Sequence, residues 1–137
     1  MPVKKNRPVS KSRIKKGPTP DPDLRFSFKF FYSSDAEMCP PTFQDEYTQT
    51  LMQRLRDLST WKVSRFTGTT DKTVRNHKHD WDRTSRPRGF VNLNAHFQAY
   101  DGWQFCLTAN EHGRVHGIMI DDTFYVIWLD QNHNLYP

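Results

Sequence analysis

The stretch RVHGIMIDDTFYVIWLD, residues 114–130, decides the predicted fold. It contains two runs rich in β-branched and aromatic residues, 114–120 and 123–130, separated by Asp121-Asp122, which is the pattern of a β-hairpin with a two-residue turn. A similar run at 103–109 precedes it. We therefore expect three short strands that form an antiparallel meander.

The expected pairing of the last two strands sorts their side chains onto two faces. With a two-residue turn, His116 lies opposite Ile127 and Arg114 lies opposite Leu129. One face is apolar and should pack on helices; it carries Val115, Gly117, Met119, Phe124, Val126 and Trp128. The other face is mixed and carries Arg114, His116, Ile118, Tyr125, Ile127 and Leu129. A β-bulge or a one-residue slip would exchange these faces.

The segments upstream predict one more strand and two helices. Apolar and polar residues alternate in 24–32, as in a strand with one buried face. After a Pro-Pro pair, an apolar stripe at helical spacing predicts a helix over 42–58, and a shorter helix should follow at 59–66. A helical turn is expected within 92–100. The predicted fold is α+β: one N-terminal strand, two helices, then a three-stranded antiparallel meander forming a small sheet packed on the helices.

The positive charge of the chain is concentrated at its N-terminus. The 137 residues carry a net charge of +5, and residues 1–23 contain seven basic and two acidic residues, so this segment accounts for the whole excess. It also contains five prolines and no aromatic residue, a composition that cannot offset the entropy of ordering. We expect 1–23 to be a disordered basic tail, and 24–137 to be a single α+β domain with a long basic loop at 67–90.

Basic residues of the tail and of the loop are candidates for binding nucleic acid. The tail cations favour a non-specific phosphate-binding arm over a merely solubilising tail; they are Lys4, Lys5, Arg7, Lys11, Arg13, Lys15 and Lys16. The loop residues expected to contact an RNA backbone are Arg75, Lys78, Arg83, Arg86 and Arg88, with Trp81 available for stacking. The alternative is a flexible surface loop whose Trp81 packs into the core.

Several functional classes find no support in the sequence. The motifs GxGxxG, GxxxxGKS/T, HExxH and GxSxG are absent from the chain. Cys39 and Cys106 lie far apart, which argues against a disulfide scaffold or a zinc ribbon. His77 and His79 have no matching second pair of ligands, so neither a metal nor another cofactor is predicted. No apolar run is long enough to span a membrane, and we expect a cytoplasmic protein without membrane contact.

Five residues near the C-terminus are candidates for catalysis: Arg114, His116, Tyr125, His133 and Tyr136. An arginine can hold a scissile phosphate and stabilise the charge that develops on it. A histidine or tyrosine can take the proton of a ribose 2′-hydroxyl, and another can protonate the leaving 5′-oxygen. These residue types therefore point to phosphodiester chemistry. The alternative is that His116 is structural and that His133 and Tyr136 merely cap the final strand.

The C-terminal motifs resemble a known family. Gly113-Arg-Val-His-Gly117, the strand that ends at Asp130, and Asn132-His-Asn-Leu-Tyr136 are similar to the last two strands and chain end of RelE/ParE-type toxins. The resemblance implies a small ribonuclease, often acting on mRNA in the ribosome and neutralised by a cognate antitoxin. It would match Arg114 to the phosphate-binding arginine, and His133 with Tyr136 to the terminal acid-base pair.

The function predicted from the sequence is that of a toxin-like endoribonuclease that cleaves RNA by metal-independent general acid-base chemistry. Its expected partners are RNA or the ribosome and a cognate antitoxin protein, and the sequence makes no prediction of the oligomeric state. Three alternatives stay open: a gyrase poison of the same family, a non-catalytic nucleic-acid or ribosome-binding module, and a protein-interaction subunit of a defence or phage system.

Overall fold

The structure is a computed structural model that describes residues 21–109 and 111–137. The seven cations of the expected basic arm lie at positions 4–16, outside the described residues. None of the helices in the described ranges is long and apolar enough to cross a membrane.

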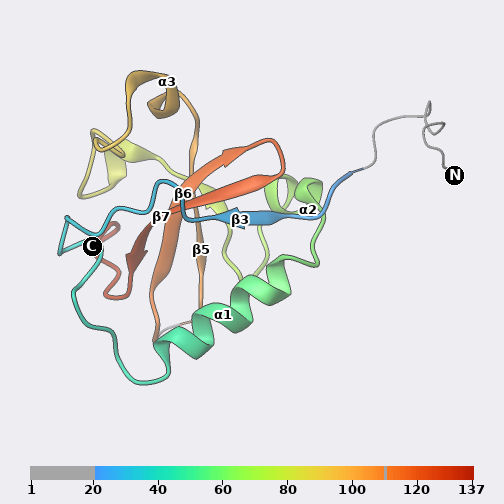
Figure 1. The fold of residues 1–137 in the computed structure, drawn as a ribbon, viewed down its shortest axis with the longest axis horizontal. Coiled ribbons are helices and arrows are strands. Elements are labelled where there is room, and N and C mark those ends of the chain that lie inside the picture. The colour runs from blue at the N-terminus through green and yellow to red at the C-terminus, as the bar shows by residue number, and fades with distance from the viewer. Residues whose placement is uncertain (1–20, 110) are drawn as a thin grey trace, which may run out of the picture.

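A five-stranded mixed sheet organises the described residues, with the strand order β3-β7-β6-β5-β4 (Figure 1). Its strands are β3 (Arg25–Ser27), β4 (His77–Lys78), β5 (Gly102–Cys106), β6 (Arg114–Ile120) and β7 (Thr123–Asp130). The first of these runs parallel to β7, and the other neighbouring pairs are antiparallel. Three helices complete the fold: α1 (Tyr47–Leu58), α2 (Val63–Gly68) and α3 (Ala95–Gln98), together with one 3₁₀ turn, η1 (Trp81–Arg83).

The predicted fold class was wrong. The sequence suggested a three-stranded antiparallel meander on two helices, with the N-terminal strand spanning 24–32. The described residues instead form a five-stranded sheet with one parallel pair, together with three helices. The N-terminal strand is only three residues long and pairs with the last strand of the chain. The segment expected to be a loop at 67–90 contributes the edge strand β4 and the turn η1. Because a two-residue strand shows no periodicity, the sequence pattern could not reveal it.

The helices begin at positions other than those expected. The first starts at Tyr47 instead of Thr42, after Glu46 adopts a left-handed conformation with φ of 67°. The second covers 63–68 instead of 59–66. The helical turn expected within 92–100 is α3, where the side chain of Asn94 accepts a hydrogen bond from the backbone of Phe97. Asparagine is among the residues preferred at the N-cap position, because its side chain satisfies a free backbone N–H of the first turn.

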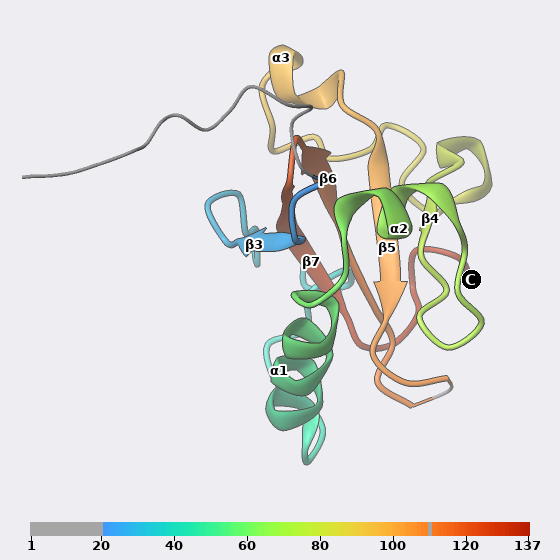
Figure 2. The same ribbon diagram turned by 90° about the vertical axis from the view of Figure 1, so that its right-hand side faces the viewer.

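Both faces of the sheet are buried. Helices α1 and α2 cover one face (Figure 2), where the apolar stripe of α1 packs with Phe105, Val115 and Phe124. The opposite face is covered by irregular segments that contribute Met38, Phe90 and Leu135, among others. The C-terminal residues fold back over this second face. The fold therefore encloses the mixed face of the β6–β7 hairpin instead of leaving it open.

A bulge changes the register of this hairpin. Ile118 lies opposite Tyr125, as expected, but a shift between His116 and Gly117 places His116 opposite Trp128 and Arg114 opposite Asp130. Gly117 permits the shift, since a Cβ at this position would lie 2.0 Å from the carbonyl oxygen of Tyr125. As a result, Trp128 packs on the second face and Leu129 packs on the helical face, the reverse of the prediction. The bulge also brings a carboxylate beside Arg114.

Gly117→Ala should therefore destabilise the fold by about 3 kcal/mol, because the added methyl group collides with backbone that cannot move aside. Urea unfolding monitored by tryptophan fluorescence would measure the change in the free energy of unfolding. Gly68→Ala provides the control, since a Cβ there meets nothing within 4 Å. Equal stability of the two variants would contradict the close packing described for the bulge.

Candidate functional site

Paired strands and the chain end together build one polar cavity on the sheet face opposite α1. Gln104 pairs in register with His77 on one side and His116 on the other, and Arg114 pairs with Asp130. The cavity has a volume of about 310 Å³ and is lined by His77, Gln104, Arg114, His116, Asp130, His133 and Tyr136. This volume is at the lower end of the range for small-molecule sites, roughly 300 to 1,000 Å³.

Four of the five residues predicted to be catalytic meet in this cavity. Arg114 and His116 reach it from alternate positions of β6, and His133 and Tyr136 reach it from the chain end. His133 adopts a left-handed conformation with φ of 60°, in the turn that follows β7. The fifth, Tyr125, packs against Phe30 at a ring distance of 5.1 Å and does not line the cavity.

The guanidinium of Arg114 is bound at one end of the cavity. Its Nη1 donates to Nε2 of His133 at 2.8 Å and lies 3.4 Å from the carbonyl oxygen of Gly113. Arginine has no acceptor atom, so Nε2 of His133 must carry the lone pair and the imidazole is neutral. Burial lowers the pKa of His133, and the charge of Arg114 lowers it further.

Arg114 is a buried cation without a carboxylate partner among the described residues. It is only 9% exposed, and no ion pair to it is found within 4.0 Å in those residues. Burial lowers its pKa. The charge of the neighbouring Asp130 offsets part of this lowering, but its carboxylate is hydrogen-bonded to His116 instead of Arg114. A desolvated guanidinium in this state favours the binding of an anion that can accept two hydrogen bonds.

A continuous chain of hydrogen bonds crosses the cavity wall. Oδ2 of Asp130 lies 3.0 Å from Nε2 of His116, and Nδ1 of His116 lies 3.1 Å from Nε2 of His79. Nδ1 of His79 lies 2.9 Å from the hydroxyl of Tyr136. The backbone N–H of Asp80 donates to the same hydroxyl at 3.3 Å. The chain therefore links a buried carboxylate to a phenol that lines the cavity.

One arrangement of protons satisfies every contact of this chain. The hydroxyl of Tyr136 donates to Nδ1 of His79, whose Nε2–H donates to His116, whose Nε2–H in turn donates to the carboxylate of Asp130. Both imidazoles are then neutral. Each group donates toward Asp130, so a proton added at the phenol can be passed inward without moving heavy atoms.

The pKa values agree with two neutral imidazoles. Burial lowers the pKa of His79 to about 2, assisted by the neighbouring His116 and His77. Burial also lowers the pKa of His116, against the opposing influence of Asp130. For Asp130 burial acts to raise the pKa, but the hydrogen bond from His116 and two backbone N–H groups lower it on balance. Perturbed groups gathered in one cavity are typical of functional sites.

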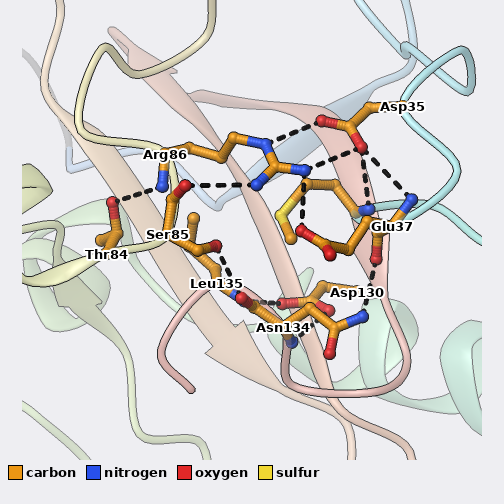
Figure 3. A network of polar contacts seen from close by, with 9 residues as sticks. Asp35, Glu37, Thr84, Ser85, Arg86, Asp130, Asn134 and Leu135 are labelled. Atoms are coloured by element: carbon orange, nitrogen blue, oxygen red, sulfur yellow. Dashed lines mark hydrogen bonds and ion pairs between the residues drawn. The ribbon is translucent and has the colours of Figure 1, made fainter.

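The chain end is held in place by a second polar network (Figure 3). Asp130 accepts hydrogen bonds from the backbone of Asn134 at 2.8 Å and Leu135 at 3.0 Å. Ser85 donates its backbone N–H to Leu135 and its hydroxyl to Asn134. Arg86, next to Ser85, forms ion pairs of 2.9 Å with Asp35 and 2.8 Å with Glu37, which connect its segment to residues 35–37. The geometry of the cavity is thus fixed by contacts outside it.

The cations predicted to bind nucleic acid in the 67–90 segment have different surroundings, and none of them lines the cavity. Lys78 pairs with Asp101, Arg83 pairs with Asp80, and Arg86 is tied to its two carboxylates. Arg75 and Arg88 are exposed. Trp81 is half-buried and packs against Phe90 and Trp128, with ring distances of 4.9 and 6.4 Å. Its ring also lies over Gly102, where a side chain would collide with it.

Four cavity or chain residues were missed by the sequence analysis as acid-base or binding groups: His77, His79, Gln104 and Asp130. The two histidines were considered only as metal ligands, and in the described residues no group of three or more His, Cys, Asp or Glu side chains is placed to hold a metal ion. Asp130 was assigned to the end of an apolar strand face. The alternation of hydrophobic residues gave no signal for any of the four.

Comparisons of the chain with models of protein families, with curated proteins and with solved structures find no match. The resemblance to RelE/ParE-type toxins therefore stays a prediction from short motifs.

Proposed function

We propose that the protein is an endoribonuclease that cleaves RNA in this cavity by general acid-base chemistry without a metal ion. The observation that carries the proposal is the placement of Arg114, a buried cation without a carboxylate partner in the described residues, beside His133 and near a chain of hydrogen bonds through His116. Phosphodiester transfer needs an anion-binding group, a proton acceptor and a proton donor, each near the same phosphate. The cavity supplies candidates for all three.

Arg114 is the phosphate-binding group of the proposed mechanism. Its guanidinium lines the cavity and has donors in excess of the two protein atoms it contacts. A planar guanidinium matches two phosphate oxygens, and its charge opposes the negative charge that grows as the 2′-oxygen attacks phosphorus. The low exposure of the group strengthens this interaction because less water screens it.

Tyr136 is the proposed point of entry for the 2′-hydroxyl proton. As the phenol takes this proton, it passes its own to Nδ1 of His79, and Nε2 of His79 passes a proton to Nδ1 of His116. The positive charge then rests on His116, next to the carboxylate of Asp130. The chain gains one proton in total, and no ionised phenol has to form. Asp130 compensates the charge at the inner end.

His133 is the proposed acid. Binding of phosphate to Arg114 draws the guanidinium away from Nε2 and places an anion nearby, and both changes raise the pKa of His133 above its value in the free protein. The half-buried imidazole can take a proton from solvent and donate it to the leaving 5′-oxygen. The products are a 2′,3′-cyclic phosphate and a 5′-hydroxyl. Solvent exchange then restores both the acid and the chain.

The full-length chain should therefore cleave a single-stranded RNA oligonucleotide in the presence of EDTA and leave 2′,3′-cyclic phosphate ends. A single 2′-deoxy substitution at the cleaved position should abolish the reaction, since it removes the attacking hydroxyl. Gel separation of labelled oligonucleotides, with mass spectrometry of the ends, would measure both. The proposal fails if EDTA stops cleavage or if the 2′-deoxy oligonucleotide is cut equally fast.

A further inference from the structure

The side chain of Gln104 has no hydrogen-bond partner although it is buried in the cavity wall. The residue is 4% exposed and lines the cavity, and its Oε1 is a buried acceptor without a donor. Among the described residues no hydrogen bond to its side-chain nitrogen is found either. A buried acceptor without a donor is unfavourable. Such a group is expected where a ligand completes its bonding.

The position of Gln104 relative to Arg114 suits a single nucleotide. Gln104 is the register partner of His116, which lies two residues from Arg114 on the same strand. Strand geometry therefore separates the Cα atoms of Gln104 and Arg114 by about 8 Å, on the same face of the sheet. One nucleoside monophosphate spans this separation, with its phosphate at the arginine and its base at the carboxamide.

His77 flanks the carboxamide on the other side. It is the register partner of Gln104 on β4, is half-buried, and lines both this cavity and a neighbouring one of about 280 Å³ that includes Trp103. Its ring lies 5.9 Å from that of Tyr136. Aromatic rings beside a carboxamide are the combination with which proteins bind unstacked bases of single-stranded RNA.

We infer that the Gln104 end of the cavity binds the base of the nucleotide at the scissile phosphate through its carboxamide. A carboxamide offers one donor and one acceptor side by side, and an unpaired base presents a complementary pair, as adenine does at N6 and N7. A ligand with a phosphate but no base leaves the carboxamide unpaired. The inference rests on the proposed function in that it places an RNA nucleotide in the cavity.

The test is the binding of AMP and of ribose 5-phosphate, which lacks the base, to the full-length chain, measured by isothermal titration calorimetry. The wild type should bind AMP more tightly than ribose 5-phosphate by at least roughly tenfold, the factor typical of one two-point base contact. Gln104→Met keeps the volume of the side chain but removes both polar groups, so it should weaken AMP binding by roughly tenfold and leave ribose 5-phosphate binding unchanged. Gln104→Glu keeps the shape but removes the donor when ionised, so it should weaken AMP binding more than ribose 5-phosphate binding.

The outcomes separate this inference from the proposed function. Equal affinity of the wild type and folded Gln104→Met for AMP, or an equal weakening of ribose 5-phosphate binding, overturns the role of Gln104. A Gln104-dependent affinity for AMP in a protein that cuts no RNA overturns the ribonuclease proposal but supports the base site. If Gln104→Met fails to fold, as judged by circular dichroism, the isosteric Gln104→Glu decides between these outcomes.

Discussion

Arg114→Ala is expected to lower kcat for RNA cleavage by a factor of about 100 to 1,000, the loss typical of removing one donor to a developing negative charge. The folded state should survive the change. Arg114 is a buried cation with only His133 and a backbone carbonyl as partners among the described residues, so its removal also removes an unfavourable desolvation. Single-turnover kinetics would give kcat, and thermal unfolding would report stability.

Two further variants make this test specific. Arg114→Lys keeps the charge but loses the planar fork, so it should recover part of the activity and not all of it. Arg56→Ala is the matched control, because this arginine is highly exposed on α1 and pairs only with its neighbour Asp57. Cleavage by Arg114→Ala within a factor of about three of the wild type would exclude a role for the guanidinium in the transition state.

The parts of the fold that were predicted depend on local sequence. Strands β6 and β7 have the bounds expected from their β-branched and aromatic runs, and the two-residue turn at 121–122 fixes which residues face each other near it. For the same reason Arg114 and His116 were placed on one face, opposite the helical side. The chain end follows directly after β7, so His133 and Tyr136 had little freedom to leave this neighbourhood.

The parts that were missed depend on contacts between distant segments. Strand β3 pairs in parallel with β7 although about 100 residues separate them, and such a pairing leaves no local pattern. His79 comes from a polar segment without periodicity and reaches its place because β4 pairs with β5. The small volume of Gly102 also leaves room for its ring. Neither condition can be detected from the neighbours of His79 in the sequence.

The position of Asp130 illustrates a third limit. Strict alternation assigns it to the apolar face of β7, whereas the bulge at Gly117 turns it toward Arg114 and His116. A glycine within a strand indicates that a bulge is allowed there, but the packing of Trp128 and Leu129 on opposite faces decides that it forms. The glycine therefore indicated where the register of β6 and β7 could shift, but the sequence did not determine that a shift occurs.

Acidification is expected to destabilise the folded protein strongly. His79 is half-buried, and its pKa is about 2 in the folded state because its imidazole is largely removed from water beside His116 and His77, whereas an unfolded histidine has a pKa of about 6.5. Between these values the unfolded state binds the extra proton, so stability is fully present above pH 6.5 and decreases as the pH falls. From pH 7.5 to 4.5, His79 alone should reduce the free energy of unfolding by about 2.5 kcal/mol.

Urea unfolding at several pH values between 4.5 and 7.5 would measure this dependence, in a range where most carboxylates stay ionised. His79→Asn should reduce the slope of stability against pH, because it removes a histidine whose pKa burial lowers to about 2. His96→Asn serves as the control, since this exposed side chain on α3 is remote from the chain of hydrogen bonds and should leave the slope unchanged. Equal slopes in the wild type and His79→Asn would contradict the lowered pKa of His79 and the removal of this side chain from water that causes it.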